Sequence, residues 1–262
     1  MSDFSRRDVL QHGALLAGAG LFAGLPACTP GAIRRFDLTA EIAQAPIKGL
    51  GENAAVRVGL IGHGGRGGGL LGHALKCPGV KVTAICDMTP DHLAKGIERV
   101  KEAQGHTPDA YGDDPYAYRT LLAREDIDAV IIAVPCDLHA PMYLDCAKAG
   151  KHFYGEKPAA ITKTDADKLV AAVPKAGIVG QIGFQRRASV RYHEEIKLIK
   201  EGLIGDMLNG HAAWDNAWGP LRGWFGHMKR SGDWMLEQAC HTWDVLNWVT
   251  GTLPVAAYGA GR

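Results

Sequence analysis

A short apolar segment that passes directly into a glycine-rich loop constrains the fold of this chain more than any other feature. Residues 56–61 read Val-Arg-Val-Gly-Leu-Ile, and residues 62–67 read Gly-His-Gly-Gly-Arg-Gly, a match to Gly-x-Gly-x-x-Gly. A β-branched run of this length predicts a buried strand, and residues 68–76 predict the helix after it. The segment therefore predicts a strand–turn–helix unit.

The spacing of the loop glycines indicates what such a unit binds. Gly62 permits a tight turn, Gly64 lets backbone approach a pyrophosphate, and Gly67 lets the helix pack against the strand. A phosphate would lie at the helix N-terminus. The loop residues that would contact a dinucleotide are Gly62, His63, Gly64, Gly65, Arg66 and Gly67. The pattern alone is weak, because a glycine-rich loop is also a common plain connection.

Asp87 supports the dinucleotide interpretation, since it ends a second predicted strand, residues 80–86, and follows Gly67 by 20 residues. A carboxylate at this spacing accepts hydrogen bonds from the adenine-ribose hydroxyls and repels a 2′-phosphate. The sequence therefore predicts NAD as the cofactor in preference to NADP. The alternative is that Asp87 only ends the strand or caps the next helix.

Strand and helix patterns alternate through the rest of this half of the chain. Helices are expected over residues 91–104, 115–124, 138–150 and 163–176, and strands over residues 129–134, 152–154 and 178–184. Such alternation is typical of a parallel sheet with helices on its faces. We expect an α/β fold with a doubly wound Rossmann domain over residues 54–184.

Composition and charge exclude several classes of partner. The chain has 262 residues and a formal net charge of +1. So small a charge, without a long basic run, argues against nucleic-acid binding. The six cysteines form no Cys-x-x-Cys pair and the histidines lack His-x-x-x-His spacing, so we expect no metal site. Cysteines in apolar segments are expected to be free and buried, with disulfide formation after export as the alternative.

The first 28 residues resemble a twin-arginine signal peptide. Arg6 and Arg7 precede an uncharged run, residues 13–27, which is shorter than the roughly 20 residues that span a bilayer. The run ends in Leu-Pro-Ala-Cys, which also resembles a lipoprotein box and would place a lipid on Cys28. We expect twin-arginine export to the periplasm, with membrane contact only through the signal peptide or this lipid. Residues 29–53 are expected to form a linker.

Five ordered segments resemble the Gfo/Idh/MocA family of glucose-fructose oxidoreductase and inositol dehydrogenase. They are residues 62–67, Ala133-Val134-Pro135 with His139, Gly155-Glu156-Lys157-Pro158, residues 183–187, and residues 237–244 with Trp248. The resemblance implies that Pro135, with His139, lies near the nicotinamide. It also implies that Glu156 contacts the cofactor and that Lys157 contacts it and acts in catalysis.

The resemblance further implies that a helix supplies other catalytic side chains. We expect this helix over residues 232–251, where Glu237, His241 and Asp244 recur at three- and four-residue spacing and so share a face. Oxidising a sugar hydroxyl needs a base for its proton while hydride leaves for the nicotinamide. His241 is the natural base, and Lys157 would polarise the same oxygen or relay its proton. Glu237 stands where the family often carries Asp; a purely structural pair with His241 is the alternative.

Other polar and aromatic side chains in this half are open to two interpretations. Arg186 and Asp244 are candidate substrate contacts, and a solvated or salt-bridged role is the alternative for the arginine. Six tryptophans lie between residues 214 and 248, where they would either stack on a sugar ring or form core.

Residues 185–262 are expected to begin a substrate-binding α+β domain with an open, mainly antiparallel sheet. Residues 255–259 would form one of its strands. Because family members usually continue for a hundred or more residues, we expect this domain to be truncated. An unpaired sheet edge would favour self-association, for example into a homo-oligomer.

These features predict an NAD(P)-dependent oxidoreductase that acts on a hydroxyl of a sugar, cyclitol or glycoside. Free NAD is expected to be scarce outside the cytoplasm, and twin-arginine export carries folded proteins, so the cofactor would be retained and recycled. One alternative is an NAD-dependent glycoside hydrolase or lyase that oxidises the sugar ring transiently. Another is a non-catalytic sugar-binding protein that contains NAD.

Overall fold

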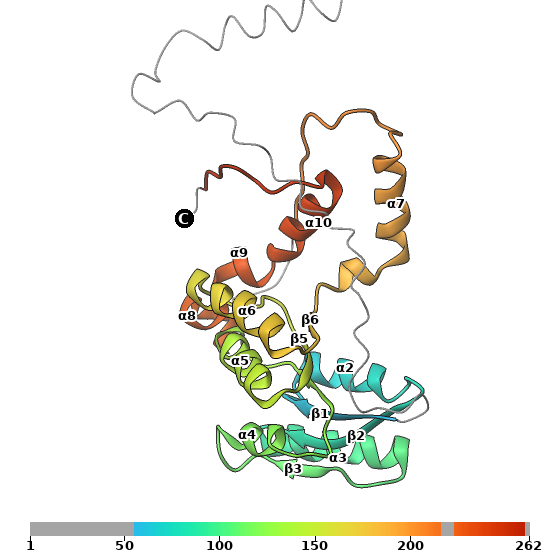
Figure 1. Ribbon diagram of the computed structural model, residues 1–262, viewed down its shortest axis with the longest axis vertical. Helices are drawn as coiled ribbons and strands as arrows, with labels where there is room; N and C mark the ends of the chain where they lie inside the picture. Colours follow the sequence, from blue (N-terminus) through green and yellow to red (C-terminus); the bar gives the residue numbers. More distant parts are fainter. Residues whose placement is uncertain (1–54, 216–222, 260–262) are drawn as a thin grey trace, which may run out of the picture. The chain divides into compact units, whose positions relative to one another are not determined.

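The computed structural model describes residues 55–215 and 223–259 (Figure 1). These residues all belong to one compact unit. The expected signal peptide over residues 1–28, with Cys28, and the expected linker over residues 29–53 lie outside the described residues.

A parallel sheet forms the centre of the described structure. Its strands are β1 (Val56–Ile61), β2 (Val80–Cys86), β3 (Asp109–Tyr111), β4 (Ala129–Ile132), β5 (His152–Gly155) and β6 (Gly180–Ile182). They lie in the order β3-β2-β1-β4-β5-β6, and every neighbouring pair is parallel. The order reverses between β1 and β4, which is where ligands bind in sheets of this kind. The expected doubly wound Rossmann fold is therefore confirmed.

Helices cover both faces of the sheet. They are α2 (Gly65–Ala74), α3 (Pro90–Gln104), α4 (Ala117–Leu122), α5 (His139–Ala149) and α6 (Lys163–Ala176), with a 3-10 turn η1 (Cys136–Leu138) before α5. Successive strand residues face opposite sides, so Leu60 packs into the core under α2 and α3 while Ile61 packs into the core under α4, α5 and α6. Burial on both faces explains why the strand segments are largely apolar.

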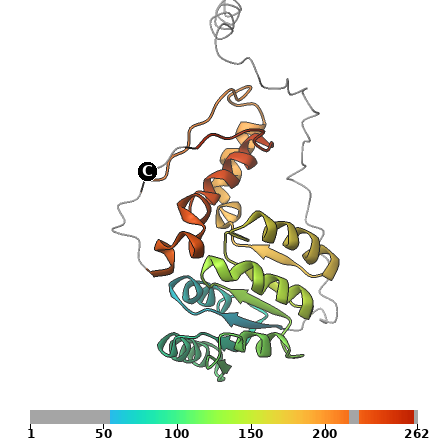
Figure 2. The ribbon, with the colours of Figure 1, turned by 90° about the vertical axis from the view of Figure 1, so that its left-hand side faces the viewer.

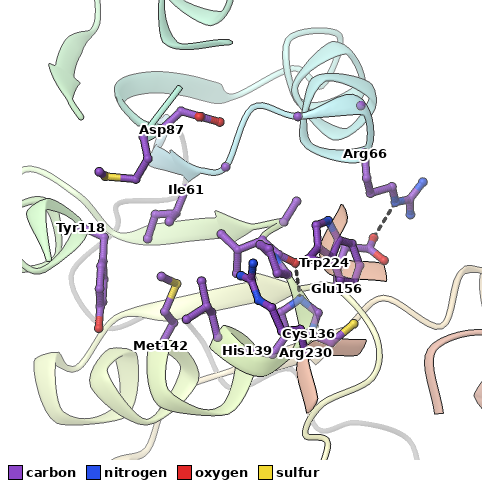
Figure 3. A pocket seen from close by; sticks show the side chains of 18 of the residues that line it. Ile61, Arg66, Asp87, Tyr118, Cys136, His139, Met142, Glu156, Trp224 and Arg230 are labelled. Atoms are coloured by element: carbon purple, nitrogen blue, oxygen red, sulfur yellow. Dashed lines mark hydrogen bonds and ion pairs between the residues drawn. The ribbon is translucent and has the colours of Figure 1, made fainter. Parts of the chain in front are cut away.

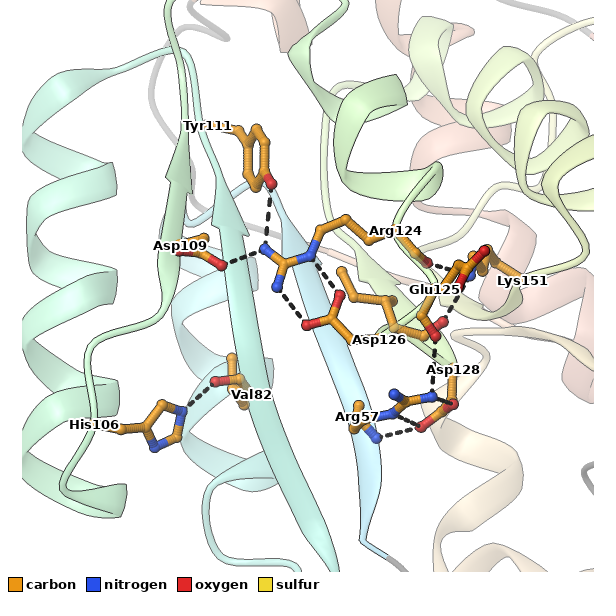
Figure 4. Close-up of polar contacts among 11 residues, drawn as sticks. Arg57, Val82, His106, Asp109, Tyr111, Arg124, Glu125, Asp126, Asp128 and Lys151 are labelled. Atoms are coloured by element: carbon orange, nitrogen blue, oxygen red, sulfur yellow. Dashed lines mark hydrogen bonds and ion pairs between the residues drawn. The ribbon is translucent and has the colours of Figure 1, made fainter. Parts of the chain in front are cut away.

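Ion pairs join β1 and β3 to the segment that leads into β4 (Figure 4). The guanidinium of Arg57 on β1 lies 2.6 Å from the carboxylate of Asp128, which also accepts the Arg57 backbone N–H at 2.7 Å. Arg124 contacts Asp109, Asp126 and the Tyr111 hydroxyl. The Arg57–Asp128 pair lies at the amino-terminal ends of β1 and β4, away from the carboxyl ends of these strands.

Helices and 3-10 turns make up the ordered elements after the sheet. They are η2 (Gln185–Ala188), α7 (Val190–Lys200), η3 (Gly223–Gly226), α8 (Met228–Ser231), α9 (Asp233–Glu237) and α10 (Cys240–Thr250). Helices α7 and α10 lie side by side (Figure 2). Between them, His193 lies edge-on to Trp248 with ring centroids 4.7 Å apart.

Three expectations for the second half are corrected. The helix expected over residues 232–251 is broken into α9 and α10 at Gln238–Ala239. The described parts of residues 185–262 are helical and contain no strand, so the expected antiparallel sheet is not found there. Residues 255–259 form no strand, because no strand among the described residues pairs with them, and Val255 and Tyr258 are 97% and 95% exposed.

The five described cysteines are free thiols. Burial raises the pKa of Cys86, Cys136 and Cys146 to about 12, which agrees with the expected role as small buried hydrophobes. Cys77 is exposed. Among residues 55–215 and 223–259, no helix combines the length and the apolar character needed to cross a membrane. The same residues contain no cluster of His, Cys, Asp and Glu suited to a metal ion.

Candidate active site

The loop between β1 and α2 has the geometry that its glycines predict. Gly62 has a φ of +88°, and a Cβ there would lie 2.3 Å from the Ala133 carbonyl oxygen. A Cβ on Gly67 would lie 1.8 Å from the Gly62 carbonyl oxygen. Gly64, at the N-cap of α2, has open space at the Cβ position, and no side chain caps the helix. The first amide N–H groups of α2 are therefore accessible to a bound anion.

This loop borders a cavity of about 1140 Å³ (Figure 3). Predicted site residues line both of its ends. At the nucleotide end these are Gly62, Gly64, Gly65, Arg66 and Asp87. At the other end they are Pro135, His139, Glu156, Lys157, Glu237 and His241. The cavity thus lies at the carboxyl ends of the strands where the sheet order reverses, and it brings together residues from both halves of the chain.

His63 and Asp87 hold the loop in shape. The Asp87 carboxylate accepts the His63 backbone N–H at 2.6 Å and the Thr89 N–H at 2.8 Å. The His63 ring does not line the cavity: it is buried toward α3, where its Nδ1 lies 2.8 Å from the His92 carbonyl oxygen. Asp87 therefore makes local contacts at the end of its strand, as the alternative interpretation predicted, and it also lines the cavity. Each carboxylate oxygen keeps a further lone pair for a ligand hydroxyl.

Arg66 and Glu156 form an ion pair along one wall of the cavity (Figure 3). Arg66 lies in the first turn of α2, and its Nε donates to Glu156 Oε1 at 2.6 Å. Glu156 follows β5 directly and is 5% exposed. The pair links the phosphate loop to the Gly-Glu-Lys-Pro segment and so connects the two ends of the cavity.

Lys157 and Glu237 form a second, more buried ion pair. The Lys157 Nζ donates to Glu237 Oε1 at 2.6 Å and to the Glu237 carbonyl oxygen at 2.5 Å. Each side chain is only 10% exposed. The other carboxylate oxygen of Glu237 accepts the side-chain amide of Gln238. Glu237 therefore pairs with Lys157, and not with His241 as the single-helix interpretation expected, because the helix is broken between Glu237 and His241.

His241 lies close to this pair as an uncharged imidazole. Burial lowers its pKa to about 4, and the positive charges of Lys157, Arg186 and Arg66 act in the same direction. The side chain is 2% exposed, and its Nδ1 has no hydrogen-bond partner among the described residues. The Trp214 ring stacks on it with centroids 6.1 Å apart. At neutral pH the ring is therefore uncharged, and its unprotonated nitrogen has a lone pair available to a substrate hydroxyl.

The two candidate substrate contacts lie outside the cavity lining. The Arg186 guanidinium lies 4.5 Å from the centroid of the Trp214 ring, and Trp214 itself lines the cavity. The Asp244 carboxylate accepts the Nε of Arg187 at 2.9 Å through both oxygens. Arg187 thus takes the salt-bridged role with Asp244, and Arg186 packs on a tryptophan that faces the cavity.

Arg230 is among the cavity residues that the sequence does not single out. It lines the cavity, and its Nε lies 3.1 Å from the Asp137 carboxylate across the two halves of the chain. No pattern in the sequence distinguishes Arg230 from a solvated basic residue. Trp214 and Trp224 of the predicted tryptophan cluster also line the cavity.

The arrangement has one end suited to a dinucleotide and one suited to proton transfer. The loop from Gly62 to Gly67 would hold the phosphates, Asp87 would hold the ribose, and Pro135 and Glu156 would lie further along. The open position above Gly64 is the space that a phosphate needs. At the other end, a neutral imidazole and an ammonium face the same space, which suits removal of a proton from a hydroxyl whose oxygen is held by a positive charge.

Two family models match the chain. Residues 56–184 match the model described as oxidoreductase family, NAD-binding Rossmann fold, and residues 192–262 match the GFO/IDH/MocA C-terminal domain. A glycosyl hydrolase family 109 protein from Shewanella pealeana is 31% identical over 246 residues, 87% of this chain and 52% of the relative. An alpha-N-acetylgalactosaminidase from Shewanella oneidensis is 32% identical over 163 residues, 61% of this chain and 35% of the relative. The chain thus spans about half the length, or less, of these curated relatives.

Solved structures give a consistent result. A putative myo-inositol dehydrogenase from Sinorhizobium meliloti aligns with a TM-score of 0.60 and 25% identity over 77% of this chain and 57% of that one. A 3-ketoreductase from Actinomadura kijaniata in complex with NADP aligns with a TM-score of 0.50 and 27% identity over 58% of this chain and 44% of that one. A probable dehydrogenase from Thermotoga maritima, 24% identical with a TM-score of 0.59 over 75% of this chain and 55% of that one, shows the shared fold.

Proposed function

The chain belongs to the Gfo/Idh/MocA oxidoreductase family, and from that premise we propose that it is an NAD-dependent glycoside hydrolase. It would cleave a glycosidic bond through transient oxidation of the sugar ring, with no net change in the nicotinamide. The observation that carries this proposal is the uncharged, buried His241 beside Lys157 in one cavity. The glycosyl hydrolase family 109 relatives favour bond cleavage over simple dehydrogenation.

The chain's own residues have distinct parts in this proposal. When bound, the nicotinamide supplies the hydride acceptor and later the hydride donor. His241 accepts the proton of the ring hydroxyl, and Lys157 donates a hydrogen bond to the oxygen as negative charge develops on it. Glu237 fixes the Lys157 ammonium. Trp214 and Trp224 line the cavity, where their rings would contact the apolar side of a sugar.

The proposed cofactor is NAD in preference to NADP. Asp87 supports this choice, because its carboxylate faces the cavity at the end of β2 and would repel a 2′-phosphate. Nearby, His92 Nδ1 lies 3.7 Å from the Asp87 carboxylate, and it is the cation that would favour NADP if it were protonated. Nucleotide affinity measured for both dinucleotides decides between them.

The proposed location is outside the cytoplasm, reached by twin-arginine export. Arg6, Arg7 and the uncharged run after them support this location. A lipid on Cys28 would add a membrane anchor. A hydrolase that returns its nicotinamide to the starting state needs no supply of free NAD, which suits an exported protein that carries its cofactor with it. Export of the chain, and its loss when both arginines are changed to Lys, test this part.

A net oxidoreductase for a sugar or cyclitol is the second candidate. The putative myo-inositol dehydrogenase is the observation that favours it. In either case the proposed substrate is a small carbohydrate or cyclitol, and an α-N-acetylgalactosaminide is the first glycoside to try, from the name of one relative.

Nitrophenyl glycosides, free sugars and cyclitols separate these functions. Release of nitrophenol without a lasting change in nicotinamide absorbance supports the hydrolase, whereas a lasting change supports the oxidoreductase. His241→Ala and Lys157→Ala should each lower the activity observed by about 100-fold or more and leave a measurable residual rate. Activity that is unaltered in both variants contradicts the catalytic assignment, and absence of bound or bindable NAD(P) contradicts both functions.

A further inference from the structure

The two backbone carbonyls that flank Lys157 are both held by side chains of one helix. The Tyr143 hydroxyl donates to the Glu156 carbonyl oxygen at 2.6 Å, and the His139 Nδ1 lies 2.7 Å from the Pro158 carbonyl oxygen. Tyr143 and His139 lie four residues apart on α5, so they share one face of that helix. Contacts from α5 thus hold the backbone on both sides of Lys157.

The Tyr143 ring is fixed on both faces. It stacks on His139 with centroids 5.5 Å apart and on Phe153 of β5 with centroids 4.7 Å apart. The side chain is fully buried, and burial raises its pKa well above the usual value of 10. Its hydroxyl therefore stays protonated and remains a hydrogen-bond donor across the whole range of neutral pH.

Both ring nitrogens of His139 lie close to backbone carbonyl oxygens. Its Nε2 lies 2.9 Å from the Val134 carbonyl oxygen, in the segment after β4 that lines the cavity. Burial lowers the pKa of His139, so the ring is neutral at neutral pH and donates one hydrogen bond. The shorter of the two contacts joins it to the Pro158 carbonyl oxygen.

Gly155 explains how the tyrosine reaches its partner. A Cβ on Gly155 would lie 2.3 Å from the Tyr143 ring and 2.4 Å from its hydroxyl oxygen. Only glycine leaves room for the ring beneath the strand at this point. The segment 155–158 therefore packs as one unit against α5. Gly155 leaves space for the tyrosine ring, and the carbonyls of Glu156 and Pro158 contact α5 on either side of Lys157.

We propose that Tyr143 is a positioning residue for Lys157, acting with His139 through the Glu156 and Pro158 carbonyls. The Lys157 ammonium reaches Glu237 and the cavity only from the backbone position that these two contacts define. The catalytic consequence of this inference rests on the proposed function, whereas its structural consequence does not.

The reactivity of Lys157 toward acetic anhydride tests the structural consequence without any substrate. Tyr143→Phe keeps the ring and removes only the hydroxyl, so the Glu156 carbonyl loses its partner in a buried site. We expect Lys157, located by peptide mass spectrometry, to be acetylated about tenfold faster in this variant, since one buried hydrogen bond is worth about that factor. Lys163, whose side chain is 87% exposed, is the internal reference and should not change.

Tyr111→Phe is the matched control. It removes another tyrosine hydroxyl, one that accepts a hydrogen bond from Arg124. Tyr111 lies on β3, at the edge of the sheet and far from Lys157. We expect normal acetylation of Lys157 there. His139→Asn provides a second test on the other carbonyl, and it should also accelerate acetylation of Lys157. Unchanged acetylation of Lys157 in both Tyr143→Phe and His139→Asn overturns the proposal.

Kinetics of aglycone release test the catalytic consequence. We expect Tyr143→Phe to lower kcat about tenfold with little change in KM. In a Lys157→Ala background the same substitution should cause no further loss, because its effect passes through the lysine. An equal loss in both backgrounds overturns the proposal. If no variant and no wild-type protein releases aglycone, the proposed function fails while the acetylation result still decides the role of Tyr143.

Discussion

The ammonium of Lys157 and the carboxylate of Glu237 lie 2.6 Å apart, although 80 residues separate them along the chain. Lys157 follows the fifth strand of the sheet, and Glu237 ends a short helix in the second half. Each side chain is 10% exposed. Separating such a pair leaves a charge buried and unpaired, so this contact joins the two halves of the chain at the point where we place the chemistry.

Neutralising one partner should therefore affect both stability and activity. Glu237→Gln retains the shape of the side chain and removes its charge. We expect the free energy of unfolding to fall by about 3 kcal/mol, because removal of one partner from a buried pair costs roughly that much. We also expect a kcat about 100-fold lower. Urea denaturation and aglycone release are the measurements.

A surface pair supplies the control for Glu237→Gln. Glu195 accepts the Nε of Arg191 at 2.8 Å on α7, where both side chains are largely exposed. Exposed pairs contribute little to stability, so Glu195→Gln should leave the unfolding transition almost unchanged. Equal losses of stability in the two variants would contradict the special role of the buried pair.

The choice between dinucleotides should depend on the charge of Asp87. Asp87→Asn keeps an oxygen that can accept the His63 N–H and removes the repulsion toward a 2′-phosphate. We expect the Kd for NAD to rise about tenfold, since hydrogen bonds to a charged group are worth about 1.5 kcal/mol or more, and the Kd for NADP to fall. Titration of tryptophan fluorescence with each dinucleotide measures both values.

Asp91→Asn removes a neighbouring negative charge from the exposed first turn of α3. It should change neither affinity by more than a small factor. If Asp91→Asn changes the ratio of NAD to NADP affinity as much as Asp87→Asn does, the negative charge of the region sets the cofactor preference. The contact of Asp87 with the ribose would then not be its cause.

The stability of the protein should decrease in mild acid because of His241. Its folded-state pKa is lowered from 6.5 to about 4, so between these values the unfolded chain binds a proton that the folded protein refuses. The contribution of the neutral His241 to the free energy of unfolding is complete above about pH 6.5 and is lost as the pH falls toward about 4. The shift corresponds to about 3 kcal/mol.

His241→Phe should remove most of this pH dependence. The free energy of unfolding, measured by urea denaturation between pH 4 and pH 7, should therefore fall more steeply in the wild type than in the variant. Burial also lowers the pKa of His63 and of His139, so a residual slope is expected. Identical slopes in the two proteins would show that His241 titrates normally when folded.

The amino-terminal end of the sheet should govern stability without affecting the site. Asp128→Ala removes the partner of both the Arg57 guanidinium and the Arg57 N–H. We expect the Tm to fall by roughly 3 °C, the usual effect of losing about 1 kcal/mol in a domain of this size, with unchanged NAD affinity. Asp126→Ala, which removes a more exposed partner of Arg124, should lower the Tm less. A change in NAD affinity in Asp128→Ala would contradict the separation of the two ends.

Most of the sheet could be predicted because its strands are buried on both faces. Largely apolar, β-branched runs at residues 56–61, 80–86 and 129–134 favour central parallel strands. Strand β3 (Asp109–Tyr111) was not predicted. It has three residues, lies at the edge of the sheet and carries an exposed Asp109, so neither length nor apolar alternation marks it.

The predicted site residues gather at one cavity, but their partners could not be predicted. Glu237 and His241 were expected on one helix face. The helix breaks at Gln238–Ala239, and nothing in those residues is a helix breaker. The structure pairs Glu237 with Lys157 instead, a contact between distant segments that no local pattern encodes. The pKa of His241 depends in the same way on packing and on three cations from other elements.

The burial of the thiols decides how the protein behaves toward reagents. A thiol with a pKa of about 12 is almost entirely protonated at neutral pH, and the thiolate is the reactive form, so Cys86, Cys136 and Cys146 should resist maleimides and mild oxidants. Cys77 is exposed directly after α2, the helix whose other end carries the phosphate loop. Cys240 is only half-buried, but burial raises its pKa to about 11, so in the described part of the chain a fluorescent dye should attach first at Cys77.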